Sequence, residues 1–443
     1  MKKKNLIVGI VVVVLLGMIL VGTLLWSKYM SQNGQEVLGD NNSEVTEESV
    51  GATEIETEVE TEIATETEVV IEKQKLRLMM IGDNLMHLSV VNAGVQADGS
   101  RNYDLLFEPI KEYLALADVK ITNQETVLGG NHLGFSGYPL FNSPTELGDS
   151  IANVGFNVVL HATNHSADKG WEGMLNCINF WETHPEVLML GMFEETDVEN
   201  QDIGILEIDG VTFAILNYTY SPNMSTLPSW LQGHLGMLCN WDTATGSIDF
   251  TTLHPDVLTD IATAKQMADV VVVCPHWGTE YTFVPSAYQK QFAKQMTEAG
   301  ADLIIGTHPH VIQPVEWVEG DNGNRALCYY SLGNYVSSQY DPKNMLEAMA
   351  WVTFETDGME VRIVEEETGA IPMVYQFVTV YNHYENVYFL DDYTESLAQA
   401  HGIHTHGGSE HTLENLERWA NEVLGDWRLG AREVFLDENN LSK

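Results

Sequence analysis

The chain has 443 residues, with 64 acidic against 21 basic side chains and a formal net charge of −43 at pH 7. A protein this acidic repels the phosphates of nucleic acids, and the sequence has neither a basic stripe nor zinc-finger spacing, which excludes nucleic acid as a partner. Its four cysteines include no Cys-x-x-Cys pair, which argues against a zinc ribbon and against a dense disulfide framework.

The N-terminal segment predicts a membrane anchor. Three lysines, Lys2 to Lys4, precede an uncharged run over residues 6–26. As a helix, this run would span about 31 Å, which is enough to cross the hydrocarbon core of a bilayer. The lysines favour a cytoplasmic tail at residues 1–5, so the chain is expected to cross the cell membrane once and to place its main domain outside the cell. A cleaved signal peptide is the alternative, although the run is longer than usual for one and no Ala-x-Ala site follows.

Residues 27–75 form a low-complexity tract of Glu, Thr and Val. Its like charges repel one another, and it offers little apolar surface to offset the entropy lost on ordering. We therefore predict a disordered acidic linker that holds the following domain away from the membrane.

Residues 76–338 carry the pattern of an α/β domain, because short apolar runs alternate with runs that have apolar residues at helical spacing. We predict strands at 76–83, 118–121, 156–162, 268–275, the start of 301–311, and 326–334. We predict helices at 104–116, from an N-cap at Ser143 to Gly155, at 255–267 and at 286–299, and a hairpin over 205–218 that turns at Asp209-Gly210. This alternation favours a buried sheet with helices on both faces.

Residues 339–443 are predicted to form a C-terminal hairpin and helical extension, packed on the domain or following it. The hairpin would occupy 350–367, a further strand 371–381 and a helix 413–423. Before this helix lies a loop with four histidines, His401, His404, His406 and His411. We expect this loop to be solvated, and adventitious metal binding is the alternative.

Each predicted strand of the domain ends at polar side chains that are able to bind a metal ion. Because ligands of open α/β sheets gather at the carboxyl ends of the strands, these side chains are expected to meet although they are far apart in sequence. The set comprises Asp83, Glu125, Asn164, His165, His276, His308 and His310. Carboxylates, imidazoles and an amide oxygen together suit Mn, Fe or Zn better than calcium. Two such metals sharing a carboxylate could clamp a phosphoryl oxygen and activate a water, with a nearby histidine as proton donor.

His308 and His310 are two residues apart, so their side chains converge only if the backbone turns between them. Gly306 and Pro309 are expected to help this turn. A lone His-x-His is often a polar loop, but the same pattern of helix, strand and polar tip recurs upstream, which favours a metal site.

The ordered motifs IGD, NQET, TNHSADKG, HWGTEY, GTHPHV and YYSLGN resemble those of the CapA family. These are capsule-synthesis proteins associated with poly-γ-glutamate, and their domain resembles the calcineurin-like metallophosphoesterases. The resemblance covers roughly residues 76–338 and implies a metallophosphoesterase-like α/β/β/α sandwich around a centre of two divalent metal ions. Carried over by motif, it implies metal ligands at Asp83, Glu125, Asn164, His276, His308 and His310, with Glu125 at the bridging position. Asp83 and His310 would bind one metal, Asn164, His276 and His308 would bind the other, and Glu125 would bridge the two.

The same resemblance implies that His165 is the general acid, and that Glu280, Tyr281 and Asn334 lie in the second shell or at the rim of the site. Metallophosphoesterases usually open with Asp-x-His, whereas this chain has leucine at position 85. One metal is therefore short of a ligand unless His87 replaces it. The bridging carboxylate also stands in an Asn-x-Glu setting, where phosphoesterases have Gly-Asp.

Three functions follow as hypotheses. The first is a membrane-anchored, extracytoplasmic component of capsule or poly-γ-glutamate biosynthesis or export, with the anionic polymer or its synthesis machinery as partner. An acidic domain should repel such a polymer, so contact is expected through the metals or through a local basic patch. The second is an extracellular metal-dependent hydrolase of phosphoesters. The third is a binding scaffold whose metal site is vestigial.

Overall fold

The computed structural model describes residues 73–196, 198–379 and 383–438. The predicted membrane span at 6–26 and most of the predicted linker at 27–75 lie outside these residues. In the part of the chain that is described, no helix has the length and the apolar character needed to cross a bilayer. The first strand, β1 (Gln74–Asn84), begins two residues before the predicted start of the domain.

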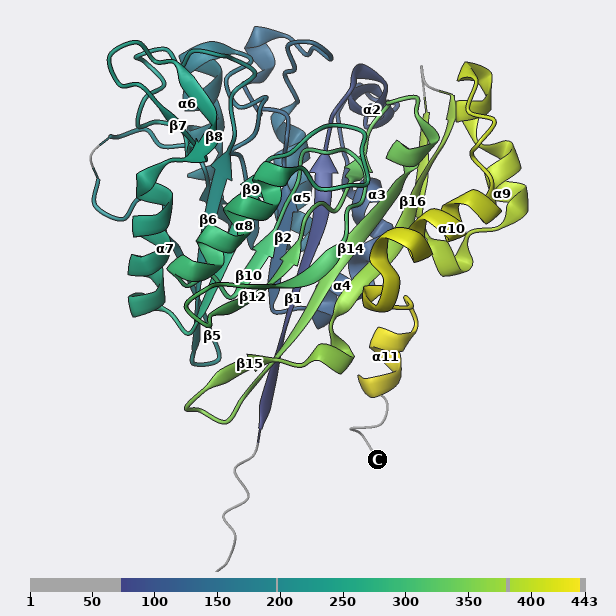
Figure 1. The fold of residues 1–443 in the computed structure, drawn as a ribbon. Helices are drawn as coiled ribbons and strands as arrows, with labels where there is room; N and C mark the ends of the chain where they lie inside the picture. Colours follow the sequence, from purple (N-terminus) through teal and green to yellow (C-terminus); the bar gives the residue numbers. More distant parts are fainter. Residues whose placement is uncertain (1–72, 197, 380–382, 439–443) are drawn as a thin grey trace, which may run out of the picture. The chain divides into compact units, whose positions relative to one another are not determined.

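Two large sheets form the framework of the described region (Figure 1). The larger has the strand order β17-β16-β14-β1-β2-β3-β4, and β13 pairs with β1 while β15 pairs with β14. Its other strands are β2 (Val119–Asn123), β3 (Val158–Leu160), β4 (Leu188–Leu190), β13 (Asn334–Val336), β14 (Leu346–Thr356), β15 (Val361–Ile363), β16 (Gly369–Thr379) and β17 (His383–Phe389). Strands β1 to β4 run parallel, and β14 runs antiparallel to β1.

The second sheet has the order β11-β12-β10-β9-β6-β5. Its strands are β5 (Gly204–Ile208), β6 (Val211–Thr219), β9 (Val270–His276), β10 (Leu303–Ile305), β11 (Val315–Glu319) and β12 (Arg325–Tyr329). Strands β6, β9, β10 and β12 run parallel. A separate pair, β7 (Cys239–Trp241) with β8 (Ile248–Leu253), stands apart from both sheets.

One of the two buried cores lies between the two sheets. Met80 of β1, Val272 of β9 and Ile305 of β10 belong to one buried cluster. Phe213 of β6 and Phe354 of β14 meet edge to face, with ring centroids 5.4 Å apart. Strands covered on both faces read as continuous apolar runs, which is why the sequence predicts them so well.

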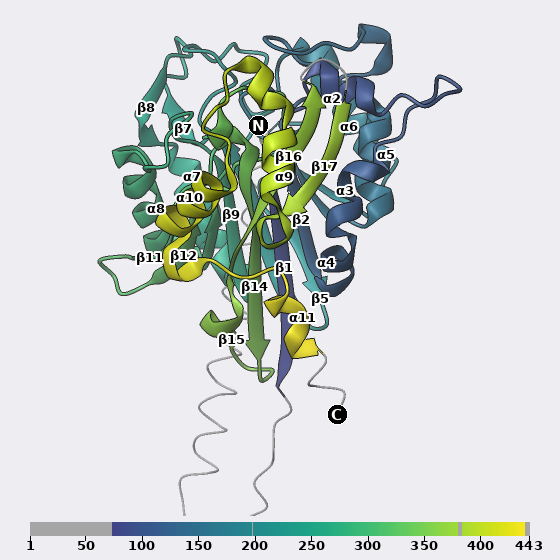
Figure 2. The same ribbon diagram turned by 90° about the vertical axis from the view of Figure 1, so that its right-hand side faces the viewer.

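Helices cover the outer faces of the two sheets (Figures 1 and 2). They are α2 (Leu88–Ala93), α3 (Asp104–Phe107), α4 (Lys111–Leu116), α5 (Thr145–Val154), α6 (Gly170–Trp181), α7 (Pro255–Met267), α8 (Ala287–Ala299) and α11 (Glu433–Glu438). Two further helices, α9 (Glu395–Ala400) and α10 (Leu413–Leu424), instead pack against the buried cluster between the sheets. α4 contacts β1, whereas α7 contacts β6 and β9, and α8 contacts β12. The predicted α/β architecture with helices on both faces is confirmed, with two sheets between the helices.

Two predicted helices differ from the structure. The continuous helix expected at 104–116 is broken into α3, a 3-10 turn over Glu108–Ile110, and α4. Pro109 has no backbone N–H and restricts the residue before it, so the α-helical pattern stops there. The predicted N-cap Ser143 is also wrong, because α5 begins at Thr145 after Pro144, and the Ser143 hydroxyl pairs with the Thr126 hydroxyl at 2.7 Å instead.

The segment from residue 339 onward is part of the larger sheet. Its strand β14 pairs with β1, and β16 and β17 extend the sheet beyond it. The expectation of a solvated histidine loop is wrong for two of its four histidines, since His401 and His411 are 2% and 1% exposed. His401 Nε2 lies 2.9 Å from the carbonyl oxygen of Tyr375, and His411 Nε2 lies 3.1 Å from the hydroxyl of Tyr393.

Candidate metal centre

Polar side chains gather where strands of both sheets end. Asp83 lies near the end of β1, Glu125 follows β2, His276 ends β9, and both His308 and His310 follow β10. All five are at least 97% buried. The distances from His310 Nδ1 are 3.4 Å to Asp83 Oδ2 and 3.8 Å to Glu125 Oε2. His276 lies 4.0 Å from a carboxylate oxygen of each acid. The predicted convergence of these strand ends is therefore observed.

Gly82 allows Asp83 to reach the candidate metal centre. A Cβ atom on Gly82 would lie 2.1 Å from the carbonyl oxygen of Gly333, which is closer than any real contact of this kind. Glycine therefore lets β1 approach the chain that leads into β13 (Asn334–Val336). The Asp83 N–H then donates to that same carbonyl oxygen at 2.9 Å.

The turn that brings the two histidines together is made by the histidines themselves. His308 and His310 have φ angles of +97° and +58°, in the left-handed region that non-glycine residues rarely adopt. Each such residue costs on the order of 1–3 kcal/mol, and such strain concentrates at functional sites. Gly306, expected to help the turn, instead allows close packing, because its Cβ would lie 2.2 Å from the Tyr330 carbonyl oxygen.

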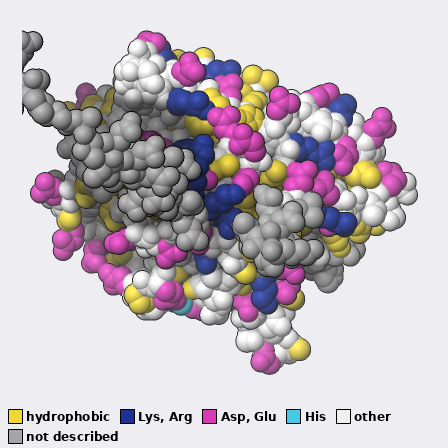
Figure 3. Space-filling model, turned by 90° about the horizontal axis from the view of Figure 1, so that it is seen from below, with side chains coloured by type: hydrophobic (Ala, Val, Ile, Leu, Met, Phe, Trp, Pro, Cys, Tyr) yellow, Lys and Arg dark blue, Asp and Glu magenta, His cyan; other side chains and the backbone are white. Residues whose placement is uncertain are grey.

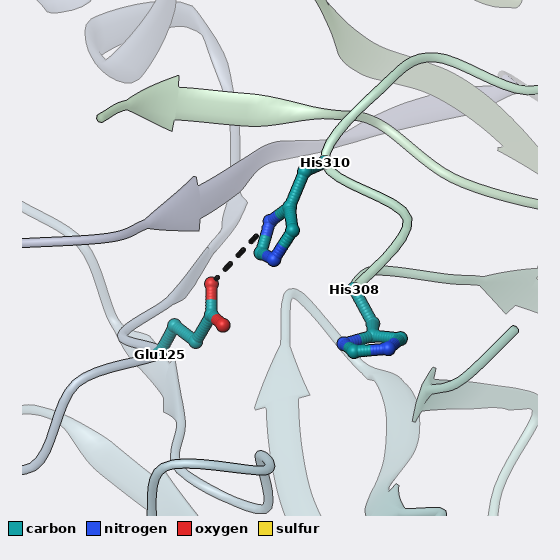
Figure 4. A group of neighbouring side chains, drawn as sticks. All are labelled: Glu125, His308 and His310. Carbon is teal, nitrogen blue, oxygen red and sulfur yellow. Dashed lines mark ion pairs between the residues drawn. The ribbon is translucent and has the colours of Figure 1, made fainter. Parts of the chain in front are cut away.

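Glu125, His308 and His310 offer one ligand atom each within 4.8 Å of one another (Figure 4). Figure 4 shows the Glu125 carboxylate and the two imidazoles facing a common space, with the histidines on one turn of the chain. Among the described residues, this is the only group of three or more His, Cys, Asp or Glu side chains with that geometry.

Buried atoms without hydrogen-bond partners surround this group, which tests whether its residues fit a metal ion. Both carboxylate oxygens of Glu125 and Nδ1 of His308 have no partner, and the side-chain oxygens of Asn84, Asn123 and Gln124 also lack one. A buried polar atom left without a partner costs about 1–3 kcal/mol. Because a divalent cation accepts lone pairs of this kind, the residues fit a metal.

Neighbouring side chains orient the ligands. Asn123 Nδ2 donates to Asp83 Oδ1 at 2.7 Å, and the backbone N–H of His308 donates to Asp83 Oδ2 at 3.1 Å. His310 Nδ1 donates to Asn334 Oδ1 at 2.8 Å, which fixes the orientation of its ring. Asn334, predicted for the second shell or the rim, thus contacts His310.

His276 and Asn164 face each other as two ligands of one ion would. His276 Nε2 lies 3.0 Å from Asn164 Oδ1, and His276 Nδ1 lies 2.9 Å from the Thr307 hydroxyl. Asn164 Nδ2 donates to Asn223 Oδ1 at 3.3 Å, which keeps the other amide atom, Oδ1, turned toward His276.

Burial sets the ionisation of these groups. Desolvation lowers the pKa of His276 and of His308 well below the usual histidine value, so both rings are neutral at neutral pH, which is the form that binds metal. Burial also acts to lower the pKa of His310, but the Glu125 carboxylate and the hydrogen bonds to Asp83 and Glu280 raise it well above the usual value. Burial raises the pKa of Glu125. A metal ion would take the place of the His310 proton that lies between this ring and the carboxylates of Asp83 and Glu125.

His165, the predicted general acid, is 6% exposed and has a partner that the sequence did not single out. Its Nδ1 lies 2.7 Å from Asp168 Oδ2, and its ring packs against Phe141 with centroids 4.6 Å apart. Asp168 also accepts the backbone N–H of Phe141 at 2.7 Å. A carboxylate three residues after the histidine in TNHSADKG was the available signal, because that spacing allows a local contact.

The remaining predicted residues lie around the centre. Glu280 Oε1 is 3.7 Å from His310 Nε2, and the Tyr281 N–H donates to the Pro309 carbonyl oxygen at 2.8 Å, as expected for rim positions. His87, the candidate replacement ligand, is not part of the group in Figure 4. Its Nδ1 instead accepts the Ser338 N–H at 3.1 Å.

Comparison with known proteins assigns a family. The profile of the family described as bacterial capsule synthesis protein PGA_cap matches residues 77–339, which is more than half of the chain. The chain belongs to the PGA_cap family. The matched region contains every residue of the candidate metal centre, and it ends before β14.

Two relatives of this PGA_cap protein are 31% identical to it. One is the PGA biosynthesis protein CapA of Bacillus subtilis, over 43% of this chain and 44% of that protein. The other is the capsule biosynthesis protein CapA of Bacillus anthracis, over 60% of this chain and 61% of that protein. The matches thus span about half the length of each relative.

A solved structure with some similarity is a Staphylococcus aureus protein that bears the provisional name 5′-nucleotidase. It is 15% identical, covers 66% of this chain and 53% of its own, and has a TM-score of 0.38. A score this low does not establish a shared fold, so the fold described above stands on the chain's own strands.

Proposed function

We propose that this PGA_cap protein is anchored in the cell membrane by residues 6–26 and acts outside the cytoplasm in the biosynthesis or export of poly-γ-glutamate, an anionic capsule polymer. Family membership over residues 77–339 and the names of the two CapA relatives support this role. The group formed by Glu125, His308 and His310 carries the proposal, because it gives the domain a site able to bind divalent metal.

The proposed cofactor is a pair of divalent ions, Mn, Fe or Zn, held by the six predicted ligands. When bound, such ions polarise an oxygen of the group they bind and stabilise negative charge on it. The chain's own part is to hold the bound group where strands of the two sheets end, at a site whose burial strengthens electrostatic interactions. His165 Nδ1 lies 2.7 Å from Asp168 Oδ2, and this contact fixes the orientation of the imidazole.

Contact with an anionic polymer is proposed through the metal centre. At the end of the domain where β1 begins and β15 lies, basic side chains alternate with acidic ones (Figure 3). Lys73, directly before β1, and Arg362 of β15 both pair with Glu355, at 2.9 and 2.5 Å. Cations that are already paired attract a polyanion weakly, so the bound metals are the better source of positive charge.

Metal content tests the proposal. Purified full-length chain should retain divalent metal after gel filtration, and His308→Ala should lose most of it in the same assay by plasma mass spectrometry. The matched control is His132→Ala, since the His132 side chain is 61% exposed and pairs with Glu172, outside the centre. Equal metal content in wild type and His308→Ala would contradict the proposed site.

A cellular measurement tests the polymer. In the source bacterium, deletion of the gene should abolish cell-bound poly-γ-glutamate, and the wild-type and His132→Ala genes should restore it. His308→Ala should fail to restore it although the protein accumulates. Unchanged polymer after deletion would remove the proposed role.

A metal-dependent hydrolase is the second candidate, and the buried contact between His165 and Asp168 favours it. Such a pair positions an imidazole for proton transfer to a leaving group. Loaded with Mn or Zn, the chain should then cleave a generic phosphodiester, and His165→Ala should abolish turnover while metal content is kept. Absence of cleavage across a broad panel of phosphoesters would argue against hydrolysis and leave the polymer role in place.

A further inference from the structure

A pocket of about 480 Å³ lies beside the candidate metal centre and has no part in the function proposed above. Its walls include three tyrosine rings, from Tyr138, Tyr281 and Tyr340, and we call it the tyrosine pocket. These rings are 78%, 46% and 50% exposed, which is unusual for large aromatic side chains. Exposed aromatic rings around one hollow typically mark a binding site.

Hydrogen bonds join the tyrosine pocket to the metal centre. Asn334, which accepts from His310, donates through Nδ2 to Gln339 Oε1 at 2.9 Å. Gln339 Nε2 then donates to the Tyr281 hydroxyl at 3.4 Å. Asn344, another lining residue, donates to the carbonyl oxygen of His310 at 2.8 Å. A ligand in the pocket would therefore lie next to whatever the centre binds.

A second connection runs through aromatic rings. His87 lines the pocket, and its ring meets that of Phe141 edge to face with centroids 5.3 Å apart. Phe141 in turn packs against His165. Tyr138 also meets Phe141, with centroids 6.5 Å apart. The pocket thus adjoins the centre on the side of His310 and on the side of His165.

The lining of the pocket carries almost no charge. None of the lining residues, all of which are described, is lysine or arginine, and Asp341 is the one carboxylate among them. Burial lowers the pKa of His87 to about 4, so its ring is neutral at neutral pH. A phosphate or carboxylate would find no positive partner here, so the occupant should be uncharged.

The remaining chemistry selects one kind of uncharged ligand. Tyrosine rings offer apolar faces with a hydroxyl at the edge, and Ser338, Gln339 and Asn344 add neutral polar groups. A sugar ring has apolar C–H faces that pack on tyrosine rings and hydroxyls that pair with tyrosine hydroxyls, whereas an alkyl chain matches the ring faces alone. We propose that the tyrosine pocket binds an uncharged sugar ring that the substrate carries next to the group bound by the metal centre. This inference rests on the proposed function, because it places the sugar beside that centre.

A polymer with a carboxylate on every residue would then not run through the pocket. The centre would act where such a polymer, or its precursor, is joined to a sugar-bearing molecule. The substrate class is thus a glycosylated one, with the sugar held by tyrosines and the charged group held by metal.

Binding of a neutral and of a charged probe tests this inference. Full-length, zinc-loaded chain in detergent is titrated with methyl N-acetyl-β-D-glucosaminide and, separately, with N-acetyl-L-glutamate, followed by saturation-transfer NMR. The sugar should bind, and Tyr281→Ala and Tyr340→Ala should each weaken its binding about 2- to 10-fold. Tyr288→Ala should leave binding unchanged; Tyr288 lies on α8 outside the tyrosine pocket, and at 45% it is as exposed as Tyr281.

The outcomes separate this inference from the proposed function. Absence of sugar binding, or equal binding by wild type and Tyr340→Ala, would overturn the inference, and so would binding of N-acetyl-L-glutamate that the tyrosine variants abolish. Melting temperatures identify a variant that fails to fold, and Tyr138→Ala then replaces it, since that side chain is 78% exposed. Tyrosine-dependent sugar binding by a chain that retains no metal would support the pocket and contradict the metal-centred function.

Discussion

Replacing Gly82 with alanine should displace Asp83 and lower the affinity for metal. The new Cβ atom would lie 2.1 Å from the Gly333 carbonyl oxygen, and real Cβ atoms essentially never approach closer than 3.0 Å. The two segments must therefore separate by at least 0.9 Å, the difference between these distances. Both are backbone, so no side chain can rotate to relieve the contact. A shift of about 1 Å at a binding group costs on the order of 100-fold.

The assay is a zinc titration of metal-stripped, full-length chain, together with its melting temperature. Gly82→Ala should weaken zinc binding about 100-fold, and overpacking of this kind should cost roughly 1–3 kcal/mol of stability. Gly148→Ala in α5 is the matched control, because its Cβ would lie 2.2 Å from Cε1 of Phe180 in α6, a similar overlap between helices that carry no predicted ligand. The control should lose stability and keep its affinity for zinc.

Wild-type zinc affinity in Gly82→Ala would refute the reasoning, because the strand could then yield without moving Asp83. An equal loss of affinity in Gly148→Ala would show that general destabilisation, and not the position of Asp83, is responsible.

Three further predictions concern groups that support the centre or the core. Asp168→Asn should lower any phosphodiesterase kcat about 100-fold and leave metal content unchanged, because His165 loses the carboxylate that orients it; an unchanged kcat would contradict this. Thr307→Val should weaken zinc binding about 10- to 100-fold, since it removes the partner of His276 Nδ1, and a titration equal to wild type would speak against that role. Burial lowers the pKa of His161 from 6.5 to about 3, so between these values the unfolded chain binds a proton that the folded chain does not. The free energy of unfolding should therefore fall by about 1.4 kcal/mol per pH unit as pH drops from 6 to 4, and this contribution should vanish from the slope measured for His161→Gln.

The strand ends of the centre are predictable because two local signals coincide there. Each buried strand reads as an apolar run, and the change to polar side chains marks its end, as at Asp83 and His276. The same reasoning does not predict the role of Asn123, whose amide donates to Asp83. An asparagine at the end of a strand is also an ordinary turn residue, so its position alone gives no signal. Residues that orient the ligands do so through contacts between strands, and no single stretch of sequence shows these contacts.

The histidine loop shows a second limit. Its glycines, threonines and histidines are typical of a solvated loop, yet His401 and His411 are buried. Their partners, Tyr375 and Tyr393, come from β16 and from the turn after β17, so the burial is a property of the fold. Pro109, by contrast, is a local signal that breaks a helix whose apolar spacing continues past it.

The pairing of β14 with β1 determines which residues should stay together when related genes recombine. The family match ends at residue 339, but β1 pairs with β14 at seven positions, from Gln74 opposite Thr356 to Met80 opposite Ala350. A protein cut at the end of the matched region would leave this length of β1 as an open edge, which invites pairing with other chains. Recombination between relatives should therefore preserve the residues through β14 together with the metal ligands, although β14 lies outside the motifs by which the family is recognised.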